Sequence, residues 1–265
     1  MSINRVTLNF ADDSMWAYLR EICGSDEQSV EGTGTVEAIR LLDRLLVAVS
    51  GTHIGPGQAA KLTTADRDWL LAAVYMKTYG SRIESTVNCA ECKAPYDMDF
   101  SLEELISHVD SEAHQMEESS DGVFKSPDGY RFRLPTGEDE CAVLGMSPEE
   151  AEKALLERCV VESNQDYDPE ALQRAMRDIA PVLDMDMDAR CPECDHQQTV
   201  HFDIQYYLLY RLQQEKRQLA WEVHRLARAY GWSLNEILGL PRSVRRMYVD
   251  LVESEIESQR RRDTS

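Results

Sequence analysis

Apolar or small side chains occupy every second position in four short segments of this chain, which form two pairs. The segments cover residues 83–87 and 96–100 in the first pair and 183–189 and 200–204 in the second. A period of two is typical of β-strands with one buried face. A Cys-x-x-Cys sequence joins the arms of each pair, with Cys89 and Cys92 in the first and Cys191 and Cys194 in the second. The pattern predicts two β-hairpins with cysteines at their tips, and their likeness suggests an internal duplication.

Apolar residues at helical spacing dominate much of the remaining chain. The first amphipathic helix is predicted by Val36, Ile39, Leu42, Leu46 and Val49. The next helix begins after the N-cap Thr63 and ends at Gly80. Two more begin at Ser147 and Asp168, because each of these capping residues precedes a proline. Before them, residues 123–134 predict another hairpin.

The longest predicted helix begins near Gln205 and ends at Gly231, and a last helix follows Pro241. Its apolar stripe is formed by Leu208, Leu212, Leu219, Val223, Leu226 and Tyr230. The basic positions of this C-terminal region include Arg225, Arg228, Arg245 and Arg246. A stripe of this length needs a partner surface, either within the chain or on another protein. The sequence supports both possibilities, and docking through the stripe and its basic neighbours is one hypothesis.

The four hairpin cysteines point to a metal site. A Cys-x-x-Cys turn aims two sulfurs at one point, and a second such turn completes a tetrahedral set of thiolates, which is typical of structural zinc. The sequence therefore predicts one structural Zn²⁺ that is bound by Cys89, Cys92, Cys191 and Cys194. As an alternative, a neighbouring histidine, His196 or His201, could replace one cysteine.

The residue after the second cysteine of such a turn is often glycine, because it takes a positive φ. Here Lys93 and Asp195 hold this position. Aspartate tolerates the left-handed conformation better than lysine does. The sequence thus predicts a distorted or different turn in the first hairpin.

Two other interpretations of the cysteines are weaker. A thioredoxin-like redox motif needs its second cysteine to run into a helix, whereas both pairs here run into strands. Structural disulfides need an oxidising compartment. The first fifteen residues contain no apolar signal segment, and no stretch approaches transmembrane length. We therefore expect a cytoplasmic protein without membrane insertion, in which Cys23, Cys141 and Cys159 are small buried hydrophobic residues.

Together these elements predict an α+β chain that is mostly helical. In this prediction the two zinc-knuckle hairpins form a zinc-ribbon-like module and a long C-terminal helical tail follows. The predicted parts are an N-terminal helical region (1–62), a zinc-knuckle body (63–204) and the tail (205–265). An acidic, exposed linker is expected near residues 107–122. Residues 1 to about 30 show little periodicity.

The formal net charge of −20 narrows the possible functions. A strongly acidic protein repels a phosphate backbone unless it has a local basic surface. Residues 204–262 are the exception, because Lys and Arg outnumber Asp and Glu there. The chain contains no glycine-rich phosphate loop, His-Glu-x-x-His helix or nucleophile elbow. We therefore expect no enzymatic activity.

Three stretches of the sequence carry a resemblance to a known family. They are DRDWLLAAVYMKTYGSRIESTVNCAECKAPYDMDFSL, YRFRLPTGEDE followed by LLERCV, and EVHRLARAYGWSLNEILGLPRSVRRMYVDLV. Taken in this order, they resemble the baseplate hub assembly chaperones of T-even-like phages and related contractile injection systems. The resemblance covers most of residues 66–252 and is weakest over residues 1–60.

This resemblance implies a non-enzymatic assembly factor or structural component of a contractile, phage-tail-like baseplate. Its partners would be baseplate or tail proteins, and it could be incorporated into a tail-like particle. The alternative function is a zinc-ribbon adaptor that binds nucleic acid. That alternative predicts basic or aromatic residues around the cysteines. Acidic residues such as Glu91, Asp97, Asp186, Asp188 and Glu193 surround them instead, which favours a protein partner.

Overall fold

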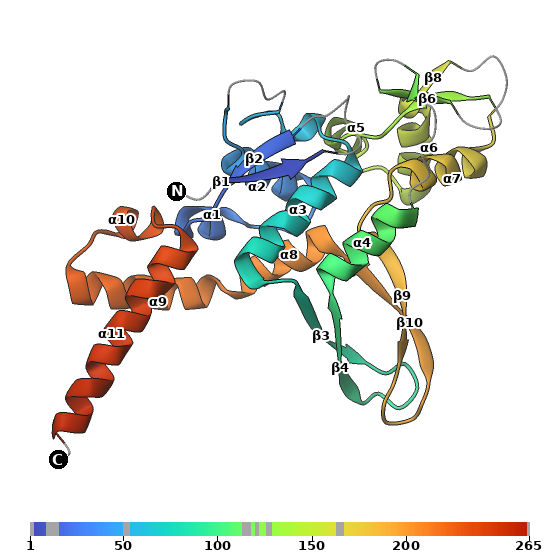
Figure 1. The fold of residues 1–265 in the computed structure, drawn as a ribbon. Helices are drawn as coiled ribbons and strands as arrows, with labels where there is room; N and C mark the ends of the chain where they lie inside the picture. The colour runs from blue at the N-terminus through green and yellow to red at the C-terminus, as the bar shows by residue number, and fades with distance from the viewer. Residues whose placement is uncertain are drawn as a thin grey trace.

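The computed structural model describes residues 3–8, 16–49, 54–112, 118–119, 122–125, 129–162 and 167–263. Over these residues the chain is an α+β protein, in which small antiparallel sheets lie at the edges of a mainly helical body and two of the hairpins project away from it (Figure 1). The sheets are three separate two-stranded hairpins and one four-stranded sheet of order β5-β6-β7-β8. None of the helices in these ranges is long and apolar enough to cross a membrane.

The elements in chain order are β1 (Ile3–Thr7), β2 (Trp16–Arg20), α1 (Gly24–Ser29), α2 (Thr35–Leu45), the 3₁₀ helix η1 (Ala59–Lys61), α3 (Thr64–Tyr79), β3 (Arg82–Asn88), β4 (Pro95–Ser101), α4 (Leu102–Glu112), β5 (Glu118–Ser119), β6 (Val123–Lys125), β7 (Arg131–Arg133), α5 (Gly137–Ala142), α6 (Pro148–Cys159), β8 (Val160–Glu162), α7 (Pro169–Ile179), β9 (Asp184–Arg190), β10 (Gln197–Asp203), α8 (Ile204–Gln214), α9 (Lys216–Tyr230), α10 (Leu234–Leu238) and α11 (Arg242–Asp263).

Local capping signals gave the correct helix boundaries in most cases. The Thr63 side chain accepts the N–H of Asp66, and Gly80 ends α3 with φ of 88°. Ser147 and Glu150 form the predicted capping box of α6, and Asp168 caps α7. These signals succeed because each depends on residues within one helical turn.

The N-terminal region differs from the prediction. Strands β1 and β2 pair as an antiparallel hairpin ahead of α1, so residues 1–62 are not only helical. Helix α2 ends at Leu45, earlier than its apolar pattern predicted, and the chain then turns extended. The N–H of Val47 donates to the carbonyl of Tyr18 at 2.8 Å, and Leu46 forms a bridge with Leu19. Pairing with β2 therefore competes with further helix after Leu45.

Two units of the chain, separated by the segment from β5 to β8, have the same order of elements. Helix α3 leads into hairpin β3–β4 and then α4, and α7 leads into hairpin β9–β10 and then α8. The hairpins and the helices after them are offset by a constant 102 residues (191 − 89 = 102). The N–H of Leu102 donates to Ser81 at 2.7 Å, and its equivalent Ile204 donates to Leu183 at 3.0 Å. These matched contacts support the internal duplication that the sequence suggested.

The two hairpins lie side by side (Figure 1). Their contacts join equivalent residues, as expected for a local twofold relation. Phe100 and Phe202 are equivalent residues, and their rings meet edge to face with centroids 5.1 Å apart. They pack at the base of the hairpins, where they join the main core. The contact between equivalent aromatic residues places the axis between the two units.

The main core includes residues from all three predicted parts of the chain. It contains Leu41 and Leu42 of α2, Leu70 and Leu71 of α3, and Leu208 of α8. A second cluster lies between β6, β7, α6 and α7, and a third lies between α9, α10 and α11. The division at residues 62 and 204 stays a prediction, although the first core crosses both positions.

The apolar stripe of the C-terminal helices is core. Leu208, Leu212, Leu219 and Leu226 are all buried within the chain, and Tyr230 is partly exposed. The hypothesis that this stripe docks on another protein is therefore wrong. The long predicted helix is also two helices, because it bends at Glu215, whose ψ is −3°. Tyr79 and Arg242 both hydrogen-bond the Glu215 carboxylate at this bend.

The segment predicted as a linker near residues 107–122 begins as ordered helix. Helix α4 extends to Glu112, and Val109 is buried in the main core. Residues 113–117 and 120–121 lie outside the described residues. The acidic composition of this segment concealed Val109, which packs in the core together with Leu102, Leu105 and Ile106 of the same helix.

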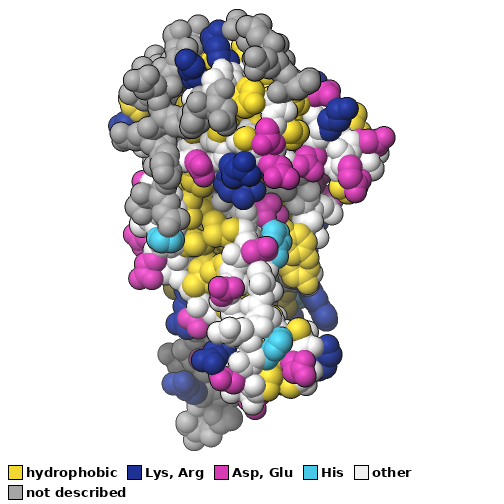
Figure 2. Space-filling view, turned by 90° about the vertical axis from the view of Figure 1, so that its right-hand side faces the viewer, with side chains coloured by type: hydrophobic (Ala, Val, Ile, Leu, Met, Phe, Trp, Pro, Cys, Tyr) yellow, Lys and Arg dark blue, Asp and Glu magenta, His cyan; other side chains and the backbone are white. Residues whose placement is uncertain are grey.

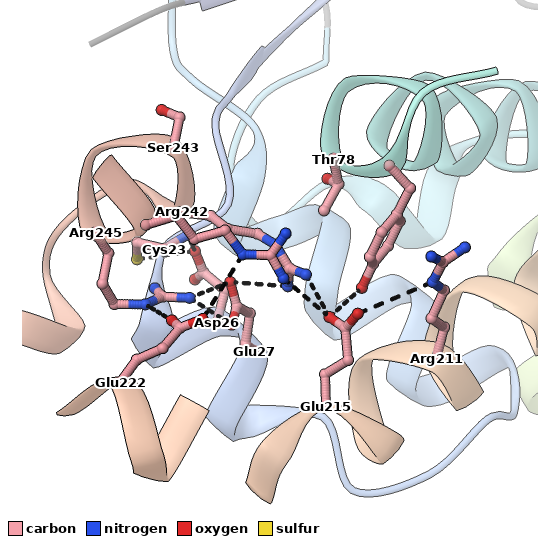
Figure 3. A network of polar contacts seen from close by, with 12 residues as sticks. Cys23, Asp26, Glu27, Thr78, Arg211, Glu215, Glu222, Arg242, Ser243 and Arg245 are labelled. Atoms are coloured by element: carbon pink, nitrogen blue, oxygen red, sulfur yellow. Dashed lines mark hydrogen bonds and ion pairs between the residues drawn. The ribbon is translucent and has the colours of Figure 1, made fainter. Parts of the chain in front are cut away.

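Buried ion pairs fix the last helix to the N-terminal segment (Figure 3). Arg245 of α11 is 1 % exposed, and it donates to Glu222 of α9 at 2.7 Å and to Glu27 of α1 at 2.8 Å. Arg242 lies 3.4 Å from Glu27 and also contacts Glu215. The expectation that Arg245 is a basic surface position is therefore wrong. It neutralises two buried carboxylates instead.

Replacement of Arg245 by alanine should destabilise the protein by about 3–5 kcal/mol, because it leaves Glu27 and Glu222 as buried charges without this partner. Urea unfolding at pH 7 would measure this change. Arg174 of α7 is the control, since its side chain is 62 % exposed and pairs only with the exposed Glu170 of its own helix among the contacts described. Arg174→Ala should cost less than about 1 kcal/mol. Equal effects of the two changes would contradict this assignment.

A buried carboxylate also connects the two duplicated units. Asp68 of α3 accepts the N–H of Leu183, directly before β9, at 3.1 Å. Desolvation raises the pKa of Asp68 to about 7, although Arg67 beside it lowers the pKa. Because the unfolded carboxylate has a pKa near 3.9, the unfolded state ionises first as pH rises. The stability that this group contributes is present at low pH and is lost between about pH 4 and 7.

Asp68→Asn should therefore stabilise the protein more at pH 8 than at pH 5, and the two gains should differ by a few kcal/mol. The asparagine oxygen can still accept the Leu183 N–H. Urea unfolding of both proteins at the two pH values would test this. The control is Asp178→Asn, at an exposed position of α7. This substitution should change the free energy of unfolding little at either pH 5 or pH 8. A gain for Asp68→Asn that is independent of pH would contradict the prediction.

Candidate metal centre

The two Cys-x-x-Cys sequences lie at the hairpin tips as predicted, and their turns are nearly identical. In the first turn, the N–H of Cys89 donates to Ala94 at 3.0 Å and the N–H of Lys93 donates to Cys89 at 3.1 Å. In the second, the N–H of Cys191 donates to His196 at 2.9 Å and the N–H of Asp195 donates to Cys191 at 3.0 Å. Both turns therefore have the geometry of a zinc knuckle.

The residue after each second cysteine takes the left-handed conformation. Lys93 has φ of 63° and Asp195 has φ of 64°, and no other non-glycine residue in the described ranges has a positive φ. The expectation of a distorted first turn is therefore wrong. Lysine adopts the knuckle conformation at some cost in backbone strain, which its contacts must offset. Its Nζ donates to the carbonyl of Ala90 at 2.6 Å.

The four sulfurs of Cys89, Cys92, Cys191 and Cys194 converge on one point. All four lie within 4.8 Å of one another, and this is the only such metal-ligand group among the described residues. The Sγ atoms of Cys89 and Cys194 are 3.6 Å apart, and those of Cys92 and Cys191 are 3.8 Å apart. A tetrahedral zinc thiolate site with bonds of about 2.3 Å requires sulfurs about 3.8 Å apart. The arrangement therefore fits a tetrahedral metal ion.

These two distances also repeat the local twofold relation. Cys89 is equivalent to Cys191, and Cys92 is equivalent to Cys194. Each short sulfur contact therefore joins the first cysteine of one turn to the second cysteine of the other turn. The axis that passes between Phe100 and Phe202 thus also passes through the centre of the four sulfurs. One metal ion on this axis would contact both units in the same way.

The pKa values of the thiols differ because the four sulfurs lie close together. Desolvation raises the pKa of Cys89, but hydrogen bonds from the backbone N–H groups of Cys92 and Glu91 and from Cys194 lower it to about 6. For Cys194, the N–H of His196 lowers the pKa, yet desolvation and contacts with the other cysteines raise it to about 12. One thiol ionises easily and makes ionisation of its neighbour harder. A cation would remove this conflict.

The centre is half enclosed by protein. Cys89 and Cys191 are buried with Tyr96, whereas Cys92 and Cys194 are exposed. Gln198 of β10 bridges the two hairpin tips, because its side chain accepts the N–H of Ala90 at 2.6 Å and donates to Asn88 at 3.3 Å. These contacts hold the two knuckles together beside the sulfurs. No sequence pattern pointed to Gln198, since its partners lie in the other hairpin.

The neighbouring histidines do not join the sulfurs in the part of the chain that the structure describes. The ring of His201 lies between two carboxylates of β9, with Nε2 3.0 Å from Asp184 and Nδ1 3.1 Å from Asp186. A hydrogen bond with Asp186 raises its pKa. Figure 2 views the molecule from the β9–β10 side and shows acidic side chains spread over this face. Exposed positions there include Asp184, Asp186 and Asp188.

The remaining cysteines lie elsewhere. Cys159 is buried at the end of α6, and burial raises the pKa of its thiol to about 11. Cys141 and Cys23 are half-buried, and Cys23 precedes α1, where its Sγ lies 3.0 Å from Asp26. The expectation of buried, unreactive positions is thus confirmed fully only for Cys159.

Comparison with known families supplies the class of the protein. The model of a family described as T4 bacteriophage base plate protein matches residues 40–173. This match spans half of the chain. The chain belongs to the T4 bacteriophage base plate protein family. No curated protein and no solved structure matches the sequence.

The base plate family match differs in extent from the resemblance found in the sequence. It begins at residue 40, within α2, and so includes part of the N-terminal region. It ends at residue 173, within α7, before the second hairpin and the C-terminal helices. The matched region thus contains the first knuckle, while Cys191 and Cys194 lie outside it.

Purified protein should contain one metal ion per chain, because four converging thiols form a closed tetrahedral site. Cys191→Ser should lower the metal content and the melting temperature together, whereas Cys141→Ser, at a thiol outside the centre, should leave the metal content unchanged. Elemental mass spectrometry and thermal unfolding with and without a chelator would measure both quantities. Metal-free folded protein with four freely titratable thiols would contradict this prediction.

Proposed function

We propose that this protein is a non-enzymatic structural component or assembly factor of a contractile, phage-tail-like baseplate. The single observation that carries this proposal is the base plate family match over residues 40–173. The resemblance of the three sequence stretches to hub assembly chaperones supports the finer role in assembly of the baseplate hub. Its partners would then be other baseplate or tail proteins, and the protein could be incorporated into the particle.

We further propose that the bound metal is a structural Zn²⁺ held by Cys89, Cys92, Cys191 and Cys194. The two knuckles would then form a zinc-ribbon-like module whose halves come from the duplicated units. A zinc ion supplies no redox chemistry and closes its coordination shell with four thiolates. In zinc-finger peptides such a site contributes on the order of 10 kcal/mol to folding. The same order of stabilisation here would hold two hairpins that are far apart in the sequence.

The absence of an enzymatic role is part of this proposal. Four thiolates leave a zinc ion without the open position that metal catalysis needs. An apolar pocket of about 210 Å³ is lined mainly by Leu134, Pro135, Leu155, Leu156, Met176 and Val182. Such a lining offers packing surface and no nucleophile with an adjacent base.

The nucleic-acid adaptor is less well supported. Its binding surface would be expected around the knuckles. There, Arg190 is paired with Asp195 at 2.7 Å, and the Lys93 Nζ donates to the carbonyl of Ala90. Arg82, at the base of the first hairpin, is paired with Glu84 and Asp99. Both arginines are therefore already neutralised, whereas a zinc-ribbon adaptor would need such side chains for phosphate contacts.

Deletion of the gene from the host that makes the particle should stop baseplate assembly, so that electron microscopy finds tails without complete baseplates. Wild-type protein should restore assembly. Cys191→Ser should restore it poorly, and Cys141→Ser should restore it fully, since only the former removes a proposed zinc ligand. Two results together would contradict the proposed function: normal particles from the deletion strain, and no association between this protein and any baseplate protein in the wild-type strain.

A further inference from the structure

Helices α8 and α9 each expose a face on the side opposite their buried leucines. We name these two faces together the α8–α9 outer face and define it by Tyr206, Tyr210, Arg217, Trp221, His224 and Arg228, all of which are exposed. At 100° per residue, Tyr206 and Tyr210 lie within about 40° of each other on α8, and the other four positions lie within about 60° of one another on α9. The buried positions Leu212, Leu219 and Leu226 lie on the opposite sides of their helices. The four positions on α9 extend over about 17 Å.

No carboxylate of α8 or α9 reaches this face. The acidic residues between Ile204 and Tyr230 are Glu215 and Glu222. Both lie on the other side of the helices, where Arg242 and Arg245 of α11 bind them (Figure 3). The α8–α9 outer face therefore presents Arg217 and Arg228 without a carboxylate from its own helices. This is an exception on a chain whose net charge is −20.

The aromatic side chains on the face are exposed and ordered. Tyr206 is 52 % exposed and Tyr210 is 46 % exposed, and their rings stack with centroids 5.6 Å apart and an interplanar angle of 8°. Trp221 is 37 % exposed, and the Arg225 guanidinium lies 4.3 Å from the centre of its ring. Tyr, Trp and Arg are the residues that most often dominate binding energy at protein interfaces. Because these side chains are already held in place, binding would immobilise little additional freedom.

The neighbouring helix α11 supplies charge of the opposite sign on one flank. A groove of about 860 Å³ opens where α11 crosses α9, and Trp221, His224 and Arg228 line one wall. The other wall carries Glu253, Glu255 and Glu257, together with one arginine, Arg260, so its formal charge is negative. Glu253 lies 4.0 Å from Arg225 and is therefore partly neutralised. The edge formed by Glu253 and Glu257 disfavours a uniformly anionic ligand such as a nucleic acid and suits a protein segment with mixed side chains.

The shape and charge of the face define its partner. Two identical copies would bring Arg217 and Arg228 against arginines of the same sign, which is unfavourable. An acidic helix can place carboxylates against Arg217 and Arg228, which lie about 17 Å apart along α9. Its apolar positions would contact Trp221 and the tyrosines. We propose that the α8–α9 outer face binds an acidic, amphipathic segment of another baseplate protein, an inference that rests on the proposed function above.

Pairwise binding to purified baseplate proteins of the same particle would test this proposal, with isothermal titration calorimetry at two salt concentrations. At least one protein with an acidic segment should bind. Trp221→Ala should weaken that binding at least about tenfold, as expected for a central aromatic anchor. The double change Arg217→Glu with Arg228→Glu should weaken it further, and it should reduce the salt dependence of the remaining binding.

The matched control is a second double charge reversal on the same protein. Arg40→Glu with Arg174→Glu makes the same change in net charge at side chains that are 67 % and 62 % exposed and lie on other helices. This control should bind as the wild type does. Thermal unfolding of all variants should show unchanged melting temperatures, since none of the substituted side chains is buried.

Each other outcome overturns the proposal in a distinguishable way. Binding of a baseplate protein that is insensitive to all α8–α9 outer face variants would reject the face and leave the proposed function standing. Failure of every baseplate protein to bind would reject both. Binding of a 20-nucleotide DNA or RNA probe that is lost in the double reversal would assign the face to nucleic acid. Self-association of the wild type that is lost in the same variant would assign it to a second copy.

Discussion

An isolated two-stranded hairpin is at best marginally stable in water, because it cannot cover its own apolar face. The hairpins β3–β4 and β9–β10 are both of this kind, since neither joins a larger sheet in the described part of the chain. Each is stabilised by the other and by the helices at its base. This constraint explains why Phe100 meets Phe202 at one end and why four sulfurs converge at the other. The duplicated units therefore depend on each other in pairs, and the four cysteines lie at the hairpin tips, outside the main core.

The rest of the chain holds the two units in this relation. Helix α8 follows the second hairpin directly and packs on α3, which precedes the first hairpin, so the core ties the beginning of one unit to the end of the other. Asp68 adds a hydrogen bond across the same junction. At the opposite end, Glu27, Glu222 and Arg245 join the N-terminal helix α1 to α9 and α11. A buried charge set of this kind is sensitive to loss of one member, so it fixes geometry more than it adds stability.

The sequence predicted features that depend on neighbouring residues and missed those that depend on distant ones. The knuckle hairpins, the Ser147 capping box and the Gly80 helix end all follow from patterns within a few residues. The roles of Arg245 and Gln198 could not be predicted, because their partners lie on other elements: Glu27 and both partners of Gln198 are more than a hundred residues away, and Glu222 is 23 residues away. Arg245 resembled a surface arginine, since the glutamates that bury it are also charged and give no apolar pattern.

The stripe of α8 and α9 illustrates the same difference at a larger scale. Periodicity identified its apolar positions correctly, but period alone does not distinguish a core from an interface. The structure assigns Leu208, Leu212 and Leu226 to the core, and this assignment determines what the opposite side of the helices can do. Arginines of α11 bind the two carboxylates of these helices in ion pairs. The exposed side chains that define the α8–α9 outer face are therefore aromatic and basic. The internal charge pairing that anchors α11 thus creates a face whose charge differs from that of the acidic body.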